Sequence, residues 1–168
     1  MAKVGFQEAF QVWLRKVVFD SDIEIEGLYS TWADKDSEFP YIVYKLEDND
    51  YQSNKVMTQA TFTVDIWDYS QLERNVLEIR EQLVELLDGM LVRLDDYEEY
   101  FLQVFQTYEE GDIICQAARI DLQSENLIPT DTDNVWRREL QFSVRYDRKR
   151  DISNILDREQ ENPLWDLS

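Results

Sequence analysis

Apolar residues recur at helical spacing near the start of the chain. Between residues 4 and 19 they form one stripe, with polar and basic residues between them: Phe6, Phe10, Trp13, Leu14 and Val17. A recurrence every three to four residues places such side chains on one face of an α-helix. The pattern predicts a helix over residues 4–19 whose apolar face packs on a core.

A different pattern, strict alternation, marks residues 60–67. One side of this segment carries Ala60, Phe62, Val64 and Ile66, and the other side carries Thr61, Thr63, Asp65 and Trp67. Alternation with a period of two, rich in Thr, Val, Ile and Phe, is typical of a strand with one buried face.

An amphipathic helix is predicted to follow this strand directly. Asp68 or Ser70 can accept a backbone hydrogen bond at its start, and Gly89 can end it. Residues 68–70 lack the glycines of a phosphate loop and the nucleophile of an active-site turn, so we expect a scaffold here. The expected core-facing stripe of the helix consists of Leu72, Val76, Ile79, Leu83 and Leu86.

Three other segments have the composition of strands before the final one. The first is IVYKL, which follows Pro40, a residue that is tolerated at the start of a strand. The other two are residues 100–108 and 112–122, and the turn at Gly111 between them predicts a β-hairpin.

The final strand alternates from Trp136 to Tyr146 and is apolar on one face apart from Arg138. The remaining stretches are polar and rich in turn residues, which predicts loops over residues 20–38, 47–57, 91–99 and 123–134. This order predicts an α+β fold: a mainly antiparallel or mixed sheet of about five strands, with two main helices packed on one face. We expect one domain over residues 1–146 and a C-terminal tail or arm over residues 147–168.

The charge balance argues against several functional classes. The 168 residues include 36 acids and 17 bases, for a formal net charge of −19, and no histidine. Histidine is the commonest general acid–base and metal ligand, so its absence lowers the expectation of an enzyme. Nucleic-acid binding needs clustered Lys and Arg, so an acidic chain is expected not to bind DNA specifically.

The apolar runs are too short for a membrane span, and the N-terminal MAKVGFQEAF lacks the apolar run of a signal peptide. We therefore expect a protein that is made and used without export and has no membrane partner. The single cysteine, Cys115, is expected to be a buried structural thiol in a reducing compartment.

Motifs for nucleotide or zinc binding (GxGxxG, GxxxxGK[ST], CxxC and HExxH) do not occur in the chain. A calcium loop starting at Asp48 would need Gly and Glu where Ser53 and Gln59 stand, and the pair Asp131 and Asp133 fails similarly. We expect no catalytic residue, no cofactor and no metal site.

Basic residues are concentrated on the last predicted strand. Residues 20–50 carry ten acids and two bases, whereas residues 137–150 carry only two acids beside Arg137, Arg138, Arg145, Arg148, Lys149 and Arg150. These bases either pair with acidic neighbours of the same chain or dock on the acidic side of an identical copy. The second arrangement is a head-to-tail contact, which closes into a ring if its rotation closes.

Aromatic residues in polar surroundings add candidates for such a contact. Trp32, Tyr41, Tyr44, Trp67 and Trp165 fall on predicted loops, on polar faces or in the tail. Aromatics in such positions are enriched at protein interfaces, although ordinary packing is the alternative for each. The candidate interface residues are Arg137, Arg145, Arg148, Lys149, Arg150, Trp67 and Trp165.

Four segments together resemble the tail terminator (tail completion) proteins of long-tailed bacteriophages. They are Pro40 to Tyr44 (PYIVY), Thr61 to Trp67 (TFTVDIW), the helix from Leu72 to Asp88, and the arginine-led strand from Arg138 to Tyr146. The likeness covers about residues 4–146 and consists of aliphatic and aromatic positions, without a catalytic signature. Segment 20–38 and the tail after residue 147 have no counterpart in this pattern.

The resemblance implies a structural virion protein of the tail and neck, assembled in the host cytoplasm. Proteins of this family form a hexameric ring that caps the tail tube protein, ends tail growth and joins the head–tail connector protein, and DNA later passes through the ring. An acidic lumen would suit that passage because like charges repel. The candidate lumen or loop residues are Asp48, Asp50, Asp95, Asp96, Glu98 and Glu99.

Two other functions stay open from the sequence. One is another phage neck protein that acts in head–tail joining or head completion. The more remote one is a carboxylate-dependent hydrolase, which needs two carboxylates across a cleft.

Overall fold

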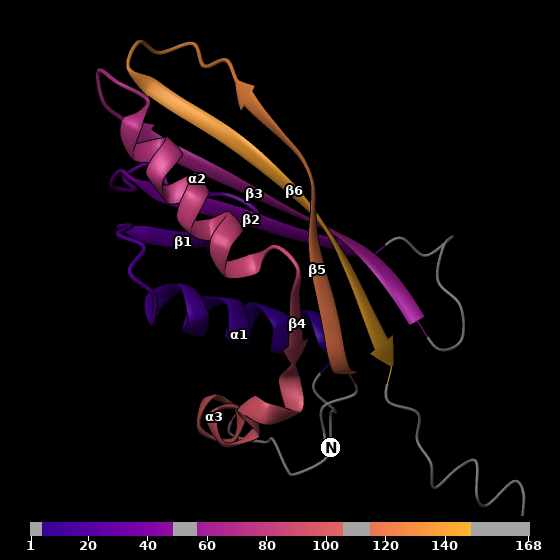
Figure 1. Ribbon diagram of the computed structural model, residues 1–168. Helices are drawn as coiled ribbons and strands as arrows, with labels where there is room; N and C mark the ends of the chain where they lie inside the picture. Colours follow the sequence, from indigo (N-terminus) through magenta and orange to yellow (C-terminus); the bar gives the residue numbers. More distant parts are fainter. Residues whose placement is uncertain (1–4, 49–56, 106–114, 149–168) are drawn as a thin grey trace, which may run out of the picture.

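A six-stranded sheet forms the centre of the computed structural model, which describes residues 5–48, 57–105 and 115–148 (Figure 1). The strands are β1 (Gly27–Ser30), β2 (Tyr41–Asp48), β3 (Met57–Tyr69), β4 (Met90–Arg93), β5 (Cys115–Ile128) and β6 (Val135–Arg148). The helices are α1 (Phe6–Phe19), α2 (Arg74–Leu87), the 3-10 helix η2 (Leu94–Tyr97) and α3 (Glu98–Val104).

The strands lie in the order β1-β2-β3-β6-β5-β4, and neighbours are antiparallel except for the parallel pair β1 and β2. The predicted α+β class is confirmed, with six strands in the described part instead of about five. None of the described helices has the length and apolarity needed to cross a membrane.

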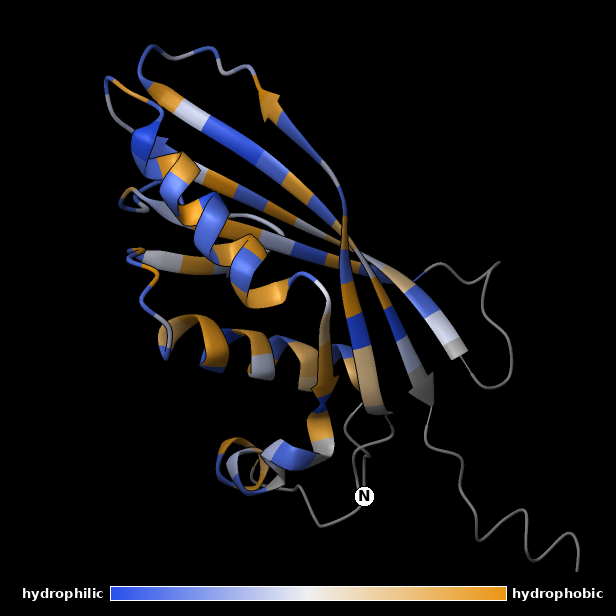
Figure 2. Ribbon diagram, viewed as in Figure 1, coloured by the Kyte–Doolittle hydropathy of each residue, from blue (hydrophilic) through white to orange (hydrophobic). Residues whose placement is uncertain are grey.

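The core lies between the sheet and the helices α1 and α2, which sit on the same side of it (Figure 1). Ala60, Phe62, Val64 and Ile66 of β3 are buried, as the alternation predicted. The ring of Phe10 in α1 meets that of Phe62 edge-on, with centroids 5.1 Å apart. Burying such a side chain contributes about 1.5–3 kcal/mol. Along the strands and around the helices, apolar residues alternate with polar ones (Figure 2).

Helix α2 differs from its prediction at the start and at the end of the apolar stripe. It begins at Arg74, and Leu72 lies before it and is 68% exposed. Leu87 is fully buried, whereas Leu86 is only partly buried. The predicted cap is also wrong, since neither Asp68 nor Ser70 is the N-cap and no side chain caps the helix.

Gly89 ends α2 as expected. Its φ of +73° is readily adopted by glycine, and its N–H donates to the carbonyl of Ile120 in β5 at 2.7 Å. The carboxylate of Asp88 accepts from the N–H of Leu122 at 2.8 Å. These two bonds fix the end of the helix against β5.

The predicted hairpin of residues 100–108 and 112–122 is wrong. Residues 98–104 form α3, and β5 pairs with β4 and β6. Phe101 of α3 is fully buried and belongs to the hydrophobic core. The apolar spacing in YFLQVF suits a one-sided helix as well as a strand, so the pattern alone could not decide.

All four predicted loops contain strands or parts of strands. Residues 20–38 include β1, residues 91–99 include most of β4 and all of η2, and residues 123–134 include the last part of β5. Strands β1 and β4 have only four residues each, too few for a visible alternation. In β5 a register shift between Leu122 and Ser124 interrupts the alternation.

The last strand extends to Arg148, two residues beyond the predicted domain end. The two ends of the predicted loop over residues 47–57 belong to strands, since Glu47 and Asp48 end β2 and Met57 begins β3. Residues 49–56 of that loop, the turn at Gly111 and the tail from residue 149 lie outside the described residues, as does the side chain of Cys115.

Candidate functional site

The face of the sheet opposite α1 and α2 is the most distinctive surface of the molecule. On β3 the even-numbered residues from Thr58 to Asp68 are buried, whereas the odd-numbered residues from Gln59 to Tyr69 all keep contact with solvent. Strand β2, and strand β6 from Leu140 to Tyr146, alternate in the same way. We call this surface the uncovered face, because none of the described helices packs on it (Figure 1).

Five aromatic side chains gather at one end of the uncovered face. This aromatic cluster consists of Tyr29, Phe39, Tyr41, Trp67 and Tyr69. The rings of Tyr41 and Trp67 stack with centroids 6.0 Å apart, and Phe39 contacts both Tyr41 at 5.1 Å and Tyr69 at 6.3 Å. Tyr69 is 59% exposed, and burial raises the pKa of Tyr41 above its ordinary value. Exposed tyrosine, tryptophan and phenylalanine together are typical of protein interfaces.

Arg137 completes the aromatic cluster but is occupied within its own chain. Its guanidinium donates to both oxygens of Asp65, at 3.2 and 3.3 Å, and lies 5.1 Å from the ring centre of Trp67. The structure thus joins two candidate interface residues, Arg137 and Trp67. For Arg137 it shows pairing inside the chain, one of the two arrangements left open by the sequence.

The opposite end of the uncovered face is basic. Arg119 and Arg145 stand directly opposite each other on β5 and β6 and share one carboxylate, that of Asp121, at 3.1 and 3.5 Å. Arg93 is exposed on the neighbouring strand β4. We call Arg93, Arg119, Arg145 and Asp121 the arginine patch.

Arg138 lies on the other side of the sheet, beneath α2. Its guanidinium is 2.9 Å from Glu73 and 3.5 Å from Glu125, and Glu125 also accepts two hydrogen bonds of 2.6 Å from Arg80 of α2. The hydrogen bond from Arg80 holds the pKa of Glu125 below its ordinary value. This network links α2 to β5 and β6, so Arg138 has a structural role.

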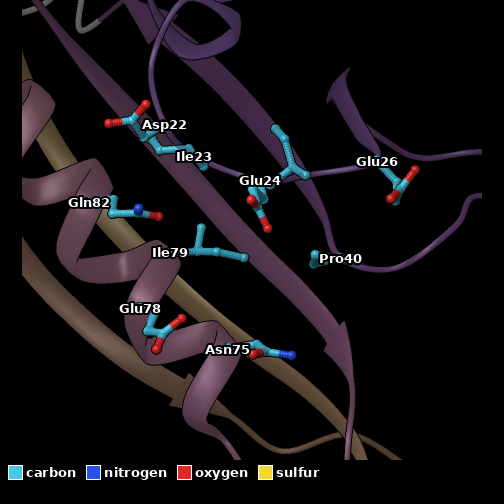
Figure 3. A pocket seen from close by; sticks show the side chains of 10 residues that line it. Asp22, Ile23, Glu24, Glu26, Pro40, Asn75, Glu78, Ile79 and Gln82 are labelled. Carbon is cyan, nitrogen blue, oxygen red and sulfur yellow. The ribbon is translucent and has the colours of Figure 1, made fainter.

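An acidic groove opens on the helix side, between α2 and the segment that leads into β1 (Figure 3). Its volume is about 660 Å³. Asp22, Glu24 and Glu26 line it from the segment, and Glu78 lines it from α2. No basic residue of the described chain lines the groove, and its apolar part includes Ile79. The excess of acids over residues 20–50 was visible in the sequence, whereas the groove that they line was not.

The described ones among the remaining predicted site residues lie on β2, η2 and α3. Asp48 is partly exposed and bonded within its own chain, since its carboxylate accepts from the Tyr146 hydroxyl at 3.0 Å and from Gln7 at 3.4 Å. Asp96 and Glu99 are exposed on η2 and α3. Asp95 lies on η2, Glu98 on α3 and Arg148 at the end of β6, and the structure does not describe their side chains. Four other predicted residues lie wholly outside the described part: Asp50, Lys149, Arg150 and Trp165.

The junction between β3 and α2 holds a buried carboxylate and a backbone carbonyl bonded to an indole. Asp68 is buried at 3% exposure, and the carbonyl of Ser70 accepts from the indole N–H of Trp136 at 3.0 Å. No group of three or more potential metal ligands occurs among the described residues.

Sequence reasoning found part of the aromatic cluster. It singled out Tyr41 and Trp67 from their polar surroundings, whereas Tyr44, also singled out, is a core residue at 3% exposure. Trp32 is 74% exposed, as a loop aromatic would be. Tyr29 was missed because its strand was predicted to be a loop. Arg119 was missed because only the pairing of β5 with β6 in the sheet places it opposite Arg145.

No protein-family model and no curated protein matches this chain.

Proposed function

We propose that this chain is a structural protein of a bacteriophage tail, a tail terminator that assembles as a ring on the tail tube. In this role it ends tail polymerisation and offers its other face to the head connector. It has no catalytic function, and DNA passes through the ring without specific binding. The ring is proposed to be hexameric, as the resemblance implies.

The observation that carries this proposal is the uncovered face with its aromatic cluster. A monomer rarely leaves such a group of rings at its surface without a binding role, and the arginine patch supplies charge for register. The four segments that carry the resemblance also lie together: β2, β3 and β6 are adjacent strands, and α2 packs on β3 and β6.

The proposal is tested by adding the purified chain to polymerising tail tube protein and measuring tube lengths by negative-stain electron microscopy. We expect ring-shaped density at tube ends and tubes that stop growing. Tubes of unchanged length with bare ends would contradict it. A triple variant, Tyr41→Ser, Trp67→Ser and Tyr69→Ser, is expected to lose the capping, whereas Phe19→Ser, an exposed aromatic of α1, keeps it.

A further inference from the structure

Within the described part of the chain, the arginine patch has fewer carboxylates than guanidinium groups. Arg119 and Arg145 face each other across β5 and β6, and like charges in that position destabilise a sheet unless an anion lies between them. Asp121 supplies one carboxylate for both, and their side chains stay 60% and 52% exposed. Among the side chains that the structure describes in this patch, three guanidinium groups, with that of Arg93, stand against one carboxylate, so the patch can accept further anions.

The acidic groove has the opposite imbalance. Four carboxylates line it and, within the described chain, no basic residue does. The groove has apolar walls, formed by Ile23, Ile25 and Ile79. They match Leu91, an exposed residue of β4 that stands opposite Arg119 of β5. Charge and polarity of the two surfaces are therefore complementary.

The two surfaces cannot meet within one molecule. The patch lies on the uncovered face, on strands β4, β5 and β6. The groove lies next to the segment that leads into β1 (Figure 3). In the strand order, β1 is the edge of the sheet opposite β4. A contact between them joins two copies head to tail, the kind of interface that generates rings.

We infer that the arginine patch of one copy docks in the acidic groove of a second copy of this chain. The inference rests on the proposed function, because it names the two surfaces through which the subunits of the ring meet. A nucleic acid is the less favoured occupant of the patch, since the chain as a whole carries a net charge of −19.

Charge reversal on each surface tests the contact, with subunit mass and affinity measured by native mass spectrometry and sedimentation. One variant carries Arg119→Glu and Arg145→Glu, and the other carries Glu24→Lys and Glu26→Lys. Each variant alone is expected to raise the dissociation constant of self-association on the order of tenfold or more, because like charges then face each other. An equimolar mixture of the two restores association, since each reversed surface meets its complement.

Lys45→Glu is the matched control, because Lys45 lies on the uncovered face outside the patch and is 54% exposed. It should leave the association unchanged. Circular dichroism and chemical unfolding check that each variant is folded, and Arg119→Gln with Arg145→Gln replaces the first variant if the reversed one is unfolded.

Several results would overturn the contact. One is unchanged self-association in both single-surface variants, and another is a loss of self-association that the mixture does not restore. A wild type that stays monomeric in solution and on tail tubes would also overturn it. The last is binding of duplex DNA by the wild type that only the arginine variant loses. Association that ignores the charges overturns this contact and leaves the proposed ring standing. Charge-dependent association of a chain that does not end tail growth keeps the contact and overturns the proposed function.

Discussion

Glu125 is the residue that ties α2 to the sheet, because it binds Arg80 of the helix and Arg138 of β6 at the same time. Glu125→Gln removes the charge and leaves both guanidinium groups with a weaker acceptor. We expect the free energy of unfolding to fall by about 1–3 kcal/mol at neutral pH, measured by urea unfolding. Glu47→Gln, in the exposed pair with Lys45, should change it by less than about 0.5 kcal/mol.

The pH dependence of this effect has a definite sign. Because the folded-state pKa of Glu125 is lowered, its contribution is full above the ordinary value of 4.5 and disappears as pH falls through the lower folded-state pKa. The difference in unfolding free energy between wild type and Glu125→Gln should therefore shrink below pH 4.5. A constant difference across that range would contradict the assigned ion pair.

Arg137 and Arg145 were alike in the sequence, and the structure separates them. Arg137 is paired with Asp65 and covers Trp67, whereas Arg145 is half exposed. Arg137→Gln is expected to destabilise the fold by about 1–2 kcal/mol, because the partly buried Asp65 loses its partner. Arg145→Gln should change stability by less than about 0.5 kcal/mol and act on self-association instead. Tryptophan-detected unfolding of both variants checks this difference.

At the scale of elements, the core between α1 and β3 gives the clearest prediction. Phe10 is fully buried and its ring contacts those of Phe6, Trp13 and Phe62. Phe10→Ala is expected to cost about 3–5 kcal/mol of unfolding free energy, since it leaves a cavity under the helix. Phe19→Ala in the same helix, where the side chain is 52% exposed, should cost far less. Similar midpoints for the two variants in thermal unfolding would contradict the packing of α1.

The elements that sequence reasoning placed correctly share a long periodic pattern. α1, β3 and β6 each repeat one spacing over many residues, so their buried faces were predictable. β1 and β4 are too short to show alternation, and both depend on pairing with a neighbouring strand. α3 was assigned to the wrong class because a short aromatic run fits both periods. The aromatic cluster and the arginine patch were only partly predictable, since each joins side chains from strands distant in sequence.

At the scale of the whole molecule, a strongly acidic chain carries a surface suited to assembly. A net charge of −19 keeps separate copies apart at low salt unless complementary surfaces meet. The uncovered face concentrates aromatic rings at one end and arginines at the other, and the groove presents carboxylates on the opposite side. This arrangement suits a subunit that binds identical copies in one fixed orientation.

The central claim, that the chain ends tail growth as a ring, is tested most directly by electron microscopy of particles from an infection that lacks this protein. The account predicts overlong tails and heads without attached tails, and normal particles when the wild-type chain is supplied. Tails of normal length joined to heads in its absence would contradict the account.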